Sequence, residues 1–239
     1  MKSTNRLAYE SSEIADAVAY ESIANEYYDE KLHPTCADFR QASSIYLTRF
    51  FGENNPRGRL ADIGCGRSLI ADFREQGLVL IDASSEMLLQ NPSSREKRLA
   101  DVERDPIGYS EFDWIFAILG DPYNTRATWA NIGRALKAGG RCLFIVPSYE
   151  WATRFRTRSS EEKPNLACFI NARGESIFLP SLIFEQKDQE KMISDAGLTP
   201  VETEHVLVGD LAHVKSPKIF KVLSRDQYLL DTYHVKKTR

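Results

Sequence analysis

One short stretch of the sequence could bind a ligand through its main chain. Residues 60–68 read LADIGCGRS, an acid-containing apolar strand pattern that runs into a glycine-containing turn. Glycine has no Cβ, so the backbone of this turn can come close to a bound molecule. In an open α/β sheet, ligands lie outside the carboxyl ends of the strands, which is where such a turn would lie.

Acidic residues at two further positions strengthen this interpretation, because a GxG pattern alone is a weak signal. The next apolar stretch ends in Asp82, 18 residues after Gly64, where a carboxylate can accept hydrogen bonds from both hydroxyls of a ribose. Another acid, Asp101, lies in a third apolar stretch. The spacing therefore indicates a site for a nucleoside-containing ligand. A glycine turn that binds nothing would explain the glycines but not the two spaced acids.

The elements that must position these residues alternate between strand and helix. Short apolar runs predict strands, and stretches with helical spacing predict helices between them. Strands are expected at residues 59–63, 78–82, 99–102, 112–119 and 141–146, and the intervening helices at 69–76, 84–91 and 125–137. This alternation is typical of a doubly wound α/β fold with a parallel sheet and helices on both faces.

Less regular elements flank this alternation. Two helices are expected before it and, after it, a hairpin, a helix and an antiparallel pair of strands. The two helices are expected over residues 12–29 and 37–51. The hairpin would pair 167–170 with 176–179, the later helix would cover 188–196, and the antiparallel strands would be 201–208 and 218–223. Because there is no internal repeat and no low-complexity linker, we expect residues 1–239 to form a single domain.

Composition excludes several classes of protein. With 42% hydrophobic and 27% charged residues and a net charge of −3, the chain suits an ordinary globular core, and neither disorder nor a strongly basic nucleic-acid binder is expected. Its longest unbroken apolar run, Trp114–Leu119, is far shorter than the ~20 residues that cross a bilayer. Four scattered cysteines without CxxC spacing predict reduced thiols in a cytoplasmic protein, and no metal site is expected.

These motifs resemble those of the class I S-adenosylmethionine-dependent methyltransferases over roughly Tyr20 to Val146. The resemblance implies a Rossmann-like methyltransferase fold, in which a doubly wound, mostly parallel seven-stranded sheet has N-terminal lid helices and an antiparallel final strand pair. It implies S-adenosyl-L-methionine as the cofactor and methyl transfer as the activity. The lid helices would then cover 12–51, the cofactor-binding core 58–147, an acceptor-side insertion 148–185, and the final helix and strands 186–239.

The resemblance also implies a role for each motif position. Asp62 and the glycine turn would hold the methionine end of the cofactor, Asp82 the ribose, and Asp101 the exocyclic amine of the adenine. The implied cofactor-binding residues are Asp62, Gly64, Cys65, Gly66, Asp82, Ala83, Met87, Asp101, Val102, Ala117 and Ile118. Ser68 departs from the pattern, since the family has its third glycine there. A nicotinamide enzyme stays as an alternative, although Leu69 occupies a position where the GxGxxG fingerprint needs a small residue.

Four residues are candidates for orienting or deprotonating an acceptor. The candidate catalytic residues are Tyr20, His33, Asp121 and Tyr123. Residues 20–27, YESIANEY, resemble the YDxxAxxY lead-in helix of many small-molecule methyltransferases, which forms a lid; alternatively, the tyrosines only pack an amphipathic helix. His33 could be structural, and Asp121 could cap the following helix with Pro122 in its first turn. The stretch DPYN differs from the (D/N)PP(Y/F) motif of nucleic-acid amino-methyltransferases in its spacing and in lacking the second proline.

The sequence does not identify the molecule that accepts the methyl group. Direct in-line transfer to a small molecule is the main hypothesis, because methyl transfer from a sulfonium needs little acid–base machinery. An RNA or DNA methyltransferase is one alternative, since residues 211–239 hold seven Lys or Arg against two Asp. Arg154, Arg156 and Arg158 would share one face and could meet phosphates if they lay on a strand, whereas on a helix or loop they would diverge into solvent. A regulatory or cofactor-cleaving protein that binds S-adenosylmethionine without methyl transfer is another. No membrane partner is expected.

Overall fold

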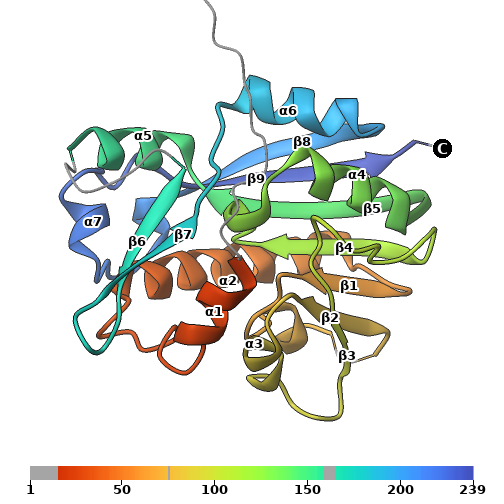
Figure 1. Ribbon diagram of the computed structural model, residues 1–239. Helices are drawn as coiled ribbons and strands as arrows, with labels where there is room; N and C mark the ends of the chain where they lie inside the picture. The colour runs from red at the N-terminus through yellow and green to blue at the C-terminus, as the bar shows by residue number, and fades with distance from the viewer. Residues whose placement is uncertain (1–15, 75, 159–164, 239) are drawn as a thin grey trace, which may run out of the picture.

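The computed structural model describes residues 16–74, 76–158 and 165–238, which contain a seven-stranded sheet (Figure 1). The strands lie in the order β3-β2-β1-β4-β5-β9-β8. They are β1 (Leu60–Ile63), β2 (Leu78–Asp82), β3 (Glu96–Leu99), β4 (Phe112–Ile118), β5 (Leu136–Pro147), β8 (Leu198–Leu207) and β9 (Tyr228–Lys237). β1 to β5 run parallel, while β9 runs antiparallel to both of its neighbours. The predicted doubly wound, mostly parallel sheet with an antiparallel final pair is confirmed.

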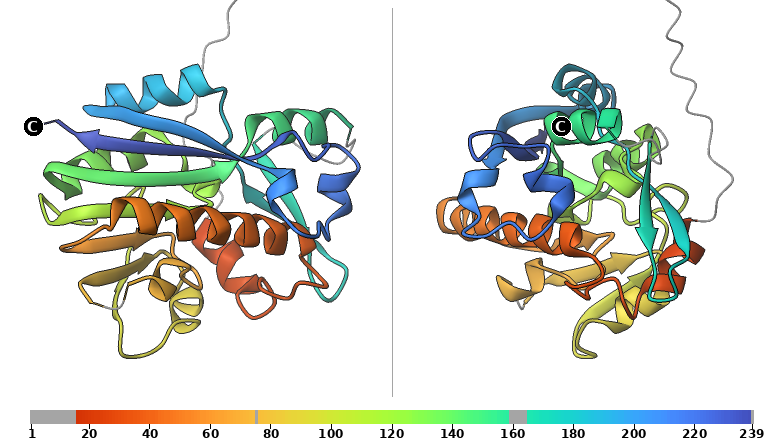
Figure 2. Two further views of the ribbon diagram at one scale, coloured as in Figure 1. Left: turned by 180° about the vertical axis from the view of Figure 1, so that it is seen from behind. Right: turned by 90° about the vertical axis from the view of Figure 1, so that its left-hand side faces the viewer.

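Helices cover both faces of this sheet (Figures 1 and 2). α2 (Pro34–Asn54) lies on one face, and α4 (Arg126–Ala135) and α6 (Gln186–Asp195) lie on the other. The remaining elements are α1 (Asp16–Ile23), α3 (Ser85–Leu89), α5 (Tyr149–Arg158), α7 (Pro217–Phe220), the hairpin strands β6 (Leu166–Ile170) and β7 (Ser176–Pro180), and the 3-10 turns η1 (Ile70–Asp72), η2 (Asp121–Tyr123) and η3 (Val208–Asp210). The predicted hairpin is confirmed. Within the described residues, no helix has the length and apolarity that a bilayer crossing requires.

Alternate residues of the central strands face two separate cores. On the α2 side, Phe116 of β4 packs against Phe50, with ring centroids 6.5 Å apart. On the α4 side, Phe144 of β5 packs against Trp129, with ring centroids 4.7 Å apart. β1 and β2 are buried along their whole length, which explains why every residue in them except Asp62 and Asp82 is apolar.

The hairpin, α5 and α7 gather beyond the carboxyl ends of β4 and β5, at the left of Figure 1. The C-terminus lies at the opposite end of the sheet, because β9 runs antiparallel and pairs its Lys236 with Arg141 of β5. The residues that the sequence singled out follow the parallel strands, so they lie at the hairpin end of the molecule.

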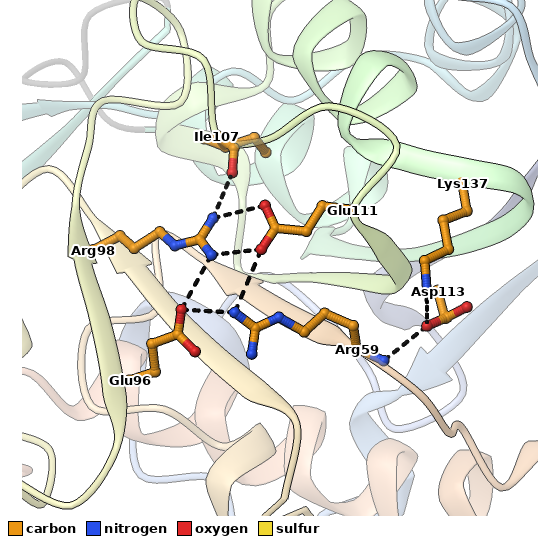
Figure 3. Close-up of polar contacts among 7 residues, drawn as sticks. All are labelled: Arg59, Glu96, Arg98, Ile107, Glu111, Asp113 and Lys137. Atoms are coloured by element: carbon orange, nitrogen blue, oxygen red, sulfur yellow. Dashed lines mark hydrogen bonds and ion pairs between the residues drawn. The ribbon is translucent and has the colours of Figure 1, made fainter.

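An ion-pair network joins the amino ends of three strands at the other edge (Figure 3). The guanidinium of Arg98 donates to both carboxylate oxygens of Glu111, at 2.9 and 2.5 Å, and Arg59 donates to Glu96 at 2.7 Å. Asp113 accepts from the backbone N–H of Arg59 at 2.8 Å. All four paired side chains are partly exposed, so each pair stabilises the fold only modestly.

One predicted strand, residues 218–223, is instead a helix followed by a turn. Asp38, which is buried in α2, accepts hydrogen bonds from the backbone N–H groups of Lys215 at 3.0 Å and Ser216 at 2.7 Å. The Ser216 hydroxyl then caps α7 by accepting from the N–H of Lys218 at 3.1 Å, and Pro217 stands in the first turn, where no N–H is needed. The antiparallel final pair therefore exists, but its second strand is β9.

Several boundaries also differ from the expected ones. The helix expected over 69–76 is only the turn η1, and β3 ends at Leu99, so Asp101 and Val102 follow it. Pro34 begins α2 where the sequence pattern predicted a break. Of the helix expected over 12–29, residues 12–15 lie outside the described part of the chain, and α1 ends at Ile23.

Candidate functional site

The glycine turn after β1 has backbone angles that favour glycine at two positions. Gly64 has a φ of +57° and Gly66 a φ of +44°, both in the left-handed region. Asn91 holds the turn, because its amide donates to the Gly66 carbonyl at 2.5 Å and accepts from the Ser68 N–H at 3.0 Å. Cys65 is buried and donates its N–H to the Ile81 carbonyl at 3.1 Å. Asn91 was not predicted, since it lies in an irregular segment with no motif around it.

Asp62 is a buried carboxylate directly beneath this turn. Its exposed fraction is 2%, and its Oδ2 accepts a hydrogen bond from the Ser68 hydroxyl at 2.5 Å. Its Oδ1 has no hydrogen-bond partner among the residues that the structure describes. Burial, together with the nearby Asp82 charge, raises the pKa of Asp62 to about 7. The site therefore holds a carboxylate with one oxygen available to a donor.

Asp82 connects the turns that follow β1 and β2. Its two carboxylate oxygens accept from the N–H groups of Gly66 at 2.7 Å and Ser84 at 2.9 Å. Burial raises the pKa of Asp82, and these backbone donors partly oppose that rise. Ala83 follows directly, and Met87 is buried one turn further along, in α3. The expected ribose-binding acid and the glycine turn are thus brought into direct contact.

Two tyrosines lie on the glycine turn. The Tyr123 hydroxyl donates to the Ile63 carbonyl at 2.6 Å, and its ring would lie 2.2 Å from a Cβ on Gly64. The Tyr28 hydroxyl accepts from the Arg67 N–H at 2.5 Å and would lie 2.2 Å from a Cβ on Gly66. The missing glycine side chains therefore make room for tyrosine rings, a role that the sequence pattern did not reveal.

The segment expected as a lid is tied to the start of α3, close to Asp82. Glu21 of α1 accepts hydrogen bonds from the N–H of Ser85 at 2.7 Å, from its hydroxyl at 2.9 Å, and from the N–H of Glu86 at 3.3 Å. These donors begin α3, so the carboxylate caps that helix from another element. α1 is thereby held beside the loop that carries Asp82.

The remaining cofactor candidates follow β3 and end β4. Asp101 accepts from the N–H of Glu103 at 2.9 Å, and the carbonyl of the buried Val102 accepts from Asn131 at 2.6 Å. Ala117 is buried and Ile118 half-buried at the end of β4. Because the carboxyl ends of parallel strands meet at one edge of a sheet, all eleven predicted cofactor-binding residues lie along that edge.

A cavity of about 240 Å³ lies beside this edge, between α2, α5, α7 and the β6–β7 hairpin. Three of the four candidate catalytic residues line it, namely Tyr20, His33 and Asp121. The fourth, Tyr123, is not among its lining residues and lies on the glycine turn instead. The tertiary structure thus separates Tyr123 from the three residues with which it was grouped.

His33 is buried at the wall of this cavity, with an exposed fraction of 6%. Its ring centroid lies 5.4 Å from that of Phe169, and its Nε2 has no hydrogen-bond partner within the described part of the chain. Burial lowers the pKa of His33. The imidazole is therefore neutral near pH 7 and has a nitrogen able to accept a proton.

Asp121 begins η2 and faces the cavity. Its Oδ2 accepts from the Ser181 hydroxyl at 2.7 Å, and burial raises its pKa to about 6. The expectation that Asp121 caps the following helix is wrong. The N-cap of α4 is Thr125, whose hydroxyl accepts from the N–H of Thr128 at 3.3 Å.

The three arginines after β5 lie on a helix, α5, and therefore diverge. Arg154 pairs with Glu150 at 2.8 Å on the surface. Arg156 lines the cavity and donates to the Ser181 carbonyl at 2.7 Å. The side chain of Arg158 lies outside the described residues. The cavity is also lined by residues that no sequence motif singled out and that come from elements far apart in the chain, among them Phe155, Phe169 and Lys218.

Comparisons with known proteins give a likeness in fold. No protein-family profile and no curated protein sequence matches this chain. Among solved structures, the DhpI-SAM-HEP complex is 14% identical, with a TM-score of 0.65 over 94% of this chain and 99% of the other. An S-adenosylmethionine-dependent methyltransferase from Clostridium acetobutylicum is 16% identical, with a TM-score of 0.61 over 91% and 98%. A Burkholderia thailandensis 1,6-didemethyltoxoflavin-N1-methyltransferase is 17% identical, with a TM-score of 0.50 over 96% and 94%.

Proposed function

We propose that this chain, which has the Rossmann-like fold of class I S-adenosylmethionine-dependent methyltransferases, is itself such an enzyme and methylates a small molecule. One observation carries the proposal: a buried carboxylate, Asp62, keeps one oxygen without a partner among the described residues, beside a turn of two left-handed glycines. The amino group of the cofactor's methionine end would satisfy that oxygen. Solved structures of this fold with SAM or S-adenosylhomocysteine in their names support the choice of cofactor.

The other residues of the edge fit the same cofactor. Asp82 stands at the end of β2, where its carboxylate would meet the ribose hydroxyls, and Asp101 follows β3, on the side where the adenine would lie. Tyr28 and Tyr123 lie on the glycine turn and would border the methionine portion. When bound, S-adenosylmethionine supplies a methyl group on a sulfonium, which is an excellent leaving group.

The acceptor would occupy the cavity beside β4. The walls that the hairpin and α5 form would exclude water and align the acceptor with the cofactor site. His33 is neutral and would accept a proton from an acceptor whose pKa is above the working pH. Asp121, anchored by Ser181, would accept a hydrogen bond from the reacting group and orient it.

Two observations favour a small molecule over a nucleic acid. The cavity volume of about 240 Å³ suits a compact acceptor. The basic residues of 211–239 lie at both ends of the sheet. Lys218 lines the cavity, whereas Lys236 and Lys237 belong to β9, where Lys237 donates to the Leu136 carbonyl at 2.8 Å, at the end of the sheet away from the cavity. A cytoplasmic location is part of the proposal and is supported by four free thiols.

Calorimetry with S-adenosylmethionine and S-adenosylhomocysteine tests the cofactor assignment. We expect saturable binding by the wild type and at least a tenfold loss of affinity in Asp82→Ala. Asp195→Asn, a surface acid that pairs with Arg126, is the control and should bind normally. Absence of binding by the folded wild type would refute the proposal.

A second experiment separates transfer from binding alone. The protein is incubated with methyl-labelled cofactor and either a metabolite extract or purified RNA and DNA. We expect label in the metabolite fraction. Label in nucleic acid would establish the alternative acceptor, cleaved cofactor without labelled acceptor would establish a cofactor-cleaving protein, and binding without turnover would indicate a regulatory role.

A further inference from the structure

We propose that the cavity selects a flat, negatively charged aromatic acceptor of one or two rings, such as an aromatic carboxylate. The inference rests on the proposed function for the identity of the site, but its three arguments come from the cavity alone. They are its volume, the arrangement of its aromatic walls, and the charges that line it.

Volume limits the size of the acceptor. The cavity holds about 240 Å³, while an engineered protein cavity of roughly 150 Å³ binds benzene. One ring with substituents or two fused rings would therefore fill it. A polymer or a long flexible chain would leave most of its surface outside.

Two groups of aromatic rings line the cavity from different sides. On one side, Tyr27 and Phe169 of β6 are stacked, with ring centroids 5.8 Å apart and an interplanar angle of 21°. On the other, Trp151 and Phe155 of α5 are stacked at 5.3 Å and 6°. Flat aromatic faces favour a planar aromatic ring over an aliphatic ring of equal volume, because a pair of aromatic rings gains binding free energy beyond that from the apolar area it buries.

The charges favour an anion. Lys218 of α7 lies between the two aromatic groups, because its Nζ donates to the Cys168 carbonyl on β6 at 3.3 Å and lies 5.2 Å from the ring centroid of Phe155. Arg156 also lines the cavity, and Asp121 is the one acid among its described lining residues. An apolar surrounding strengthens the attraction between Lys218 and an acceptor carboxylate.

The positions of these charges also orient the acceptor. Asp121 follows β4, the strand that ends in the cofactor candidates Ala117 and Ile118, so the reacting atom would lie toward Asp121. Lys218 enters from α7 and contacts the hairpin and α5. The acceptor would therefore carry its negative group and its nucleophile at different ends of the ring system.

Three matched probes test this selectivity by calorimetry on the full chain, with and without S-adenosylhomocysteine. They are 2-naphthoate, the neutral 2-naphthamide, and decahydronaphthalene-2-carboxylate, which has the charge and both rings without the aromaticity. We expect 2-naphthoate to bind at least tenfold more tightly than either of the others. Lys218→Met should reduce its affinity to that of 2-naphthamide and leave 2-naphthamide binding unchanged. Lys221→Met, three residues further along and outside the cavity lining, is the control and should keep the preference.

Each other outcome overturns a part of the inference. Equal binding of 2-naphthamide refutes the preference for an anion, and equal binding of decahydronaphthalene-2-carboxylate refutes the preference for an aromatic ring. If Lys218→Met is unstable, Lys218→Arg, which keeps the charge, must preserve the tenfold preference. Tighter binding of adenosine 5′-monophosphate than of 2-naphthoate in the presence of S-adenosylhomocysteine would refute the acceptor class.

The two proposals can fail separately. Normal S-adenosylhomocysteine binding with no probe binding refutes the acceptor class and leaves the proposed function standing. Selective 2-naphthoate binding without S-adenosylhomocysteine binding refutes the proposed function and leaves the selectivity of the cavity standing.

Discussion

The Ser68 hydroxyl donates a 2.5 Å hydrogen bond to Asp62 Oδ2, beneath the turn that follows β1. The same hydroxyl accepts from the N–H of Ala71 at 3.1 Å, so it also holds the short turn η1. Both residues are buried. The serine that departs from the family's third glycine is therefore the residue that partners the carboxylate proposed to hold the cofactor.

Replacing Ser68 tests this relationship. Ser68→Ala leaves the buried Asp62 without its one described hydrogen-bond donor, so we expect a loss of about 1–3 kcal/mol in the free energy of unfolding. Denaturant unfolding at pH 8 measures it. Ser194→Ala removes an exposed hydroxyl that donates to the Glu190 carbonyl, and its effect should stay below ~0.5 kcal/mol. Equal losses in the two variants would contradict the assigned role of Ser68.

Asp62→Asn should be more stable than the wild type at pH 8 and yet bind the cofactor less tightly. The folded pKa of Asp62, about 7, is above its ordinary value of 3.8, so folding favours the protonated form. The contribution of Asp62 to the free energy of unfolding is therefore greatest below about pH 4 and is lost as the pH rises through the folded pKa of about 7. The asparagine has no charge to bury, so its melting temperature should fall less than that of the wild type between pH 4 and pH 8. Calorimetric melting at both pH values checks this.

Cofactor affinity should rise with pH through about 7. The ammonium of the cofactor pairs best with ionised Asp62, and that carboxyl loses its proton near pH 7. We expect the dissociation constant for S-adenosylhomocysteine to fall about tenfold between pH 6 and pH 8. The dependence should be nearly flat in Asp62→Asn. A wild-type affinity that does not change over this range would exclude the pairing.

Gly64→Ala should destabilise the fold more than Gly139→Ala does. Both glycines have positive φ, +57° and +76°, so each alanine is strained. A Cβ at Gly64 would also lie 2.2 Å from the Tyr123 ring, whereas at Gly139 it meets no atom within 4 Å. The difference in unfolding free energy between the two variants therefore measures the contact with Tyr123. The destabilisation caused by Gly64→Ala should be smaller in a Tyr123→Ala background. An unchanged destabilisation would show that it does not come from contact with the Tyr123 ring.

Glu111→Gln should lower stability slightly and leave the cofactor site untouched. Arg98 holds the pKa of Glu111 below its ordinary value, so this pair stabilises the fold above pH 4.5 and the effect is lost as the pH falls through the depressed pKa. Because both side chains are partly exposed, the loss at pH 7 should be at most ~1 kcal/mol. A large change in S-adenosylhomocysteine affinity would contradict the placement of this ion pair at the amino ends of the parallel strands, opposite the glycine turn.

Local pattern was sufficient for much of the fold and for the proposed cofactor edge. Apolar runs marked β1, β2, β4 and β5, and the turns after parallel strands necessarily meet at one edge of the sheet. The spacing of Gly64, Gly66 and Asp82 could therefore predict a site before any contact was known. Local pattern predicts the wrong element where a residue far away in the chain fixes the backbone. At 218–223 a strand was predicted, but buried Asp38 of α2 accepts a hydrogen bond from the N–H of Lys215, 177 residues away, just before the helix α7 begins.

The cavity proposed for the acceptor is formed by the tertiary structure. Sequence alone determined which residue types could bind a cofactor and in what order along the chain the strands that carry them follow one another. Packing decided that Lys218 meets Cys168 across 50 residues, that Tyr28 lies on Gly66, and that Tyr123 lies on the glycine turn and not in the cavity lining. The physical reason is that strand and helix periodicity is a property of neighbouring residues, whereas a cavity wall is made by side chains that only packing between remote elements brings together.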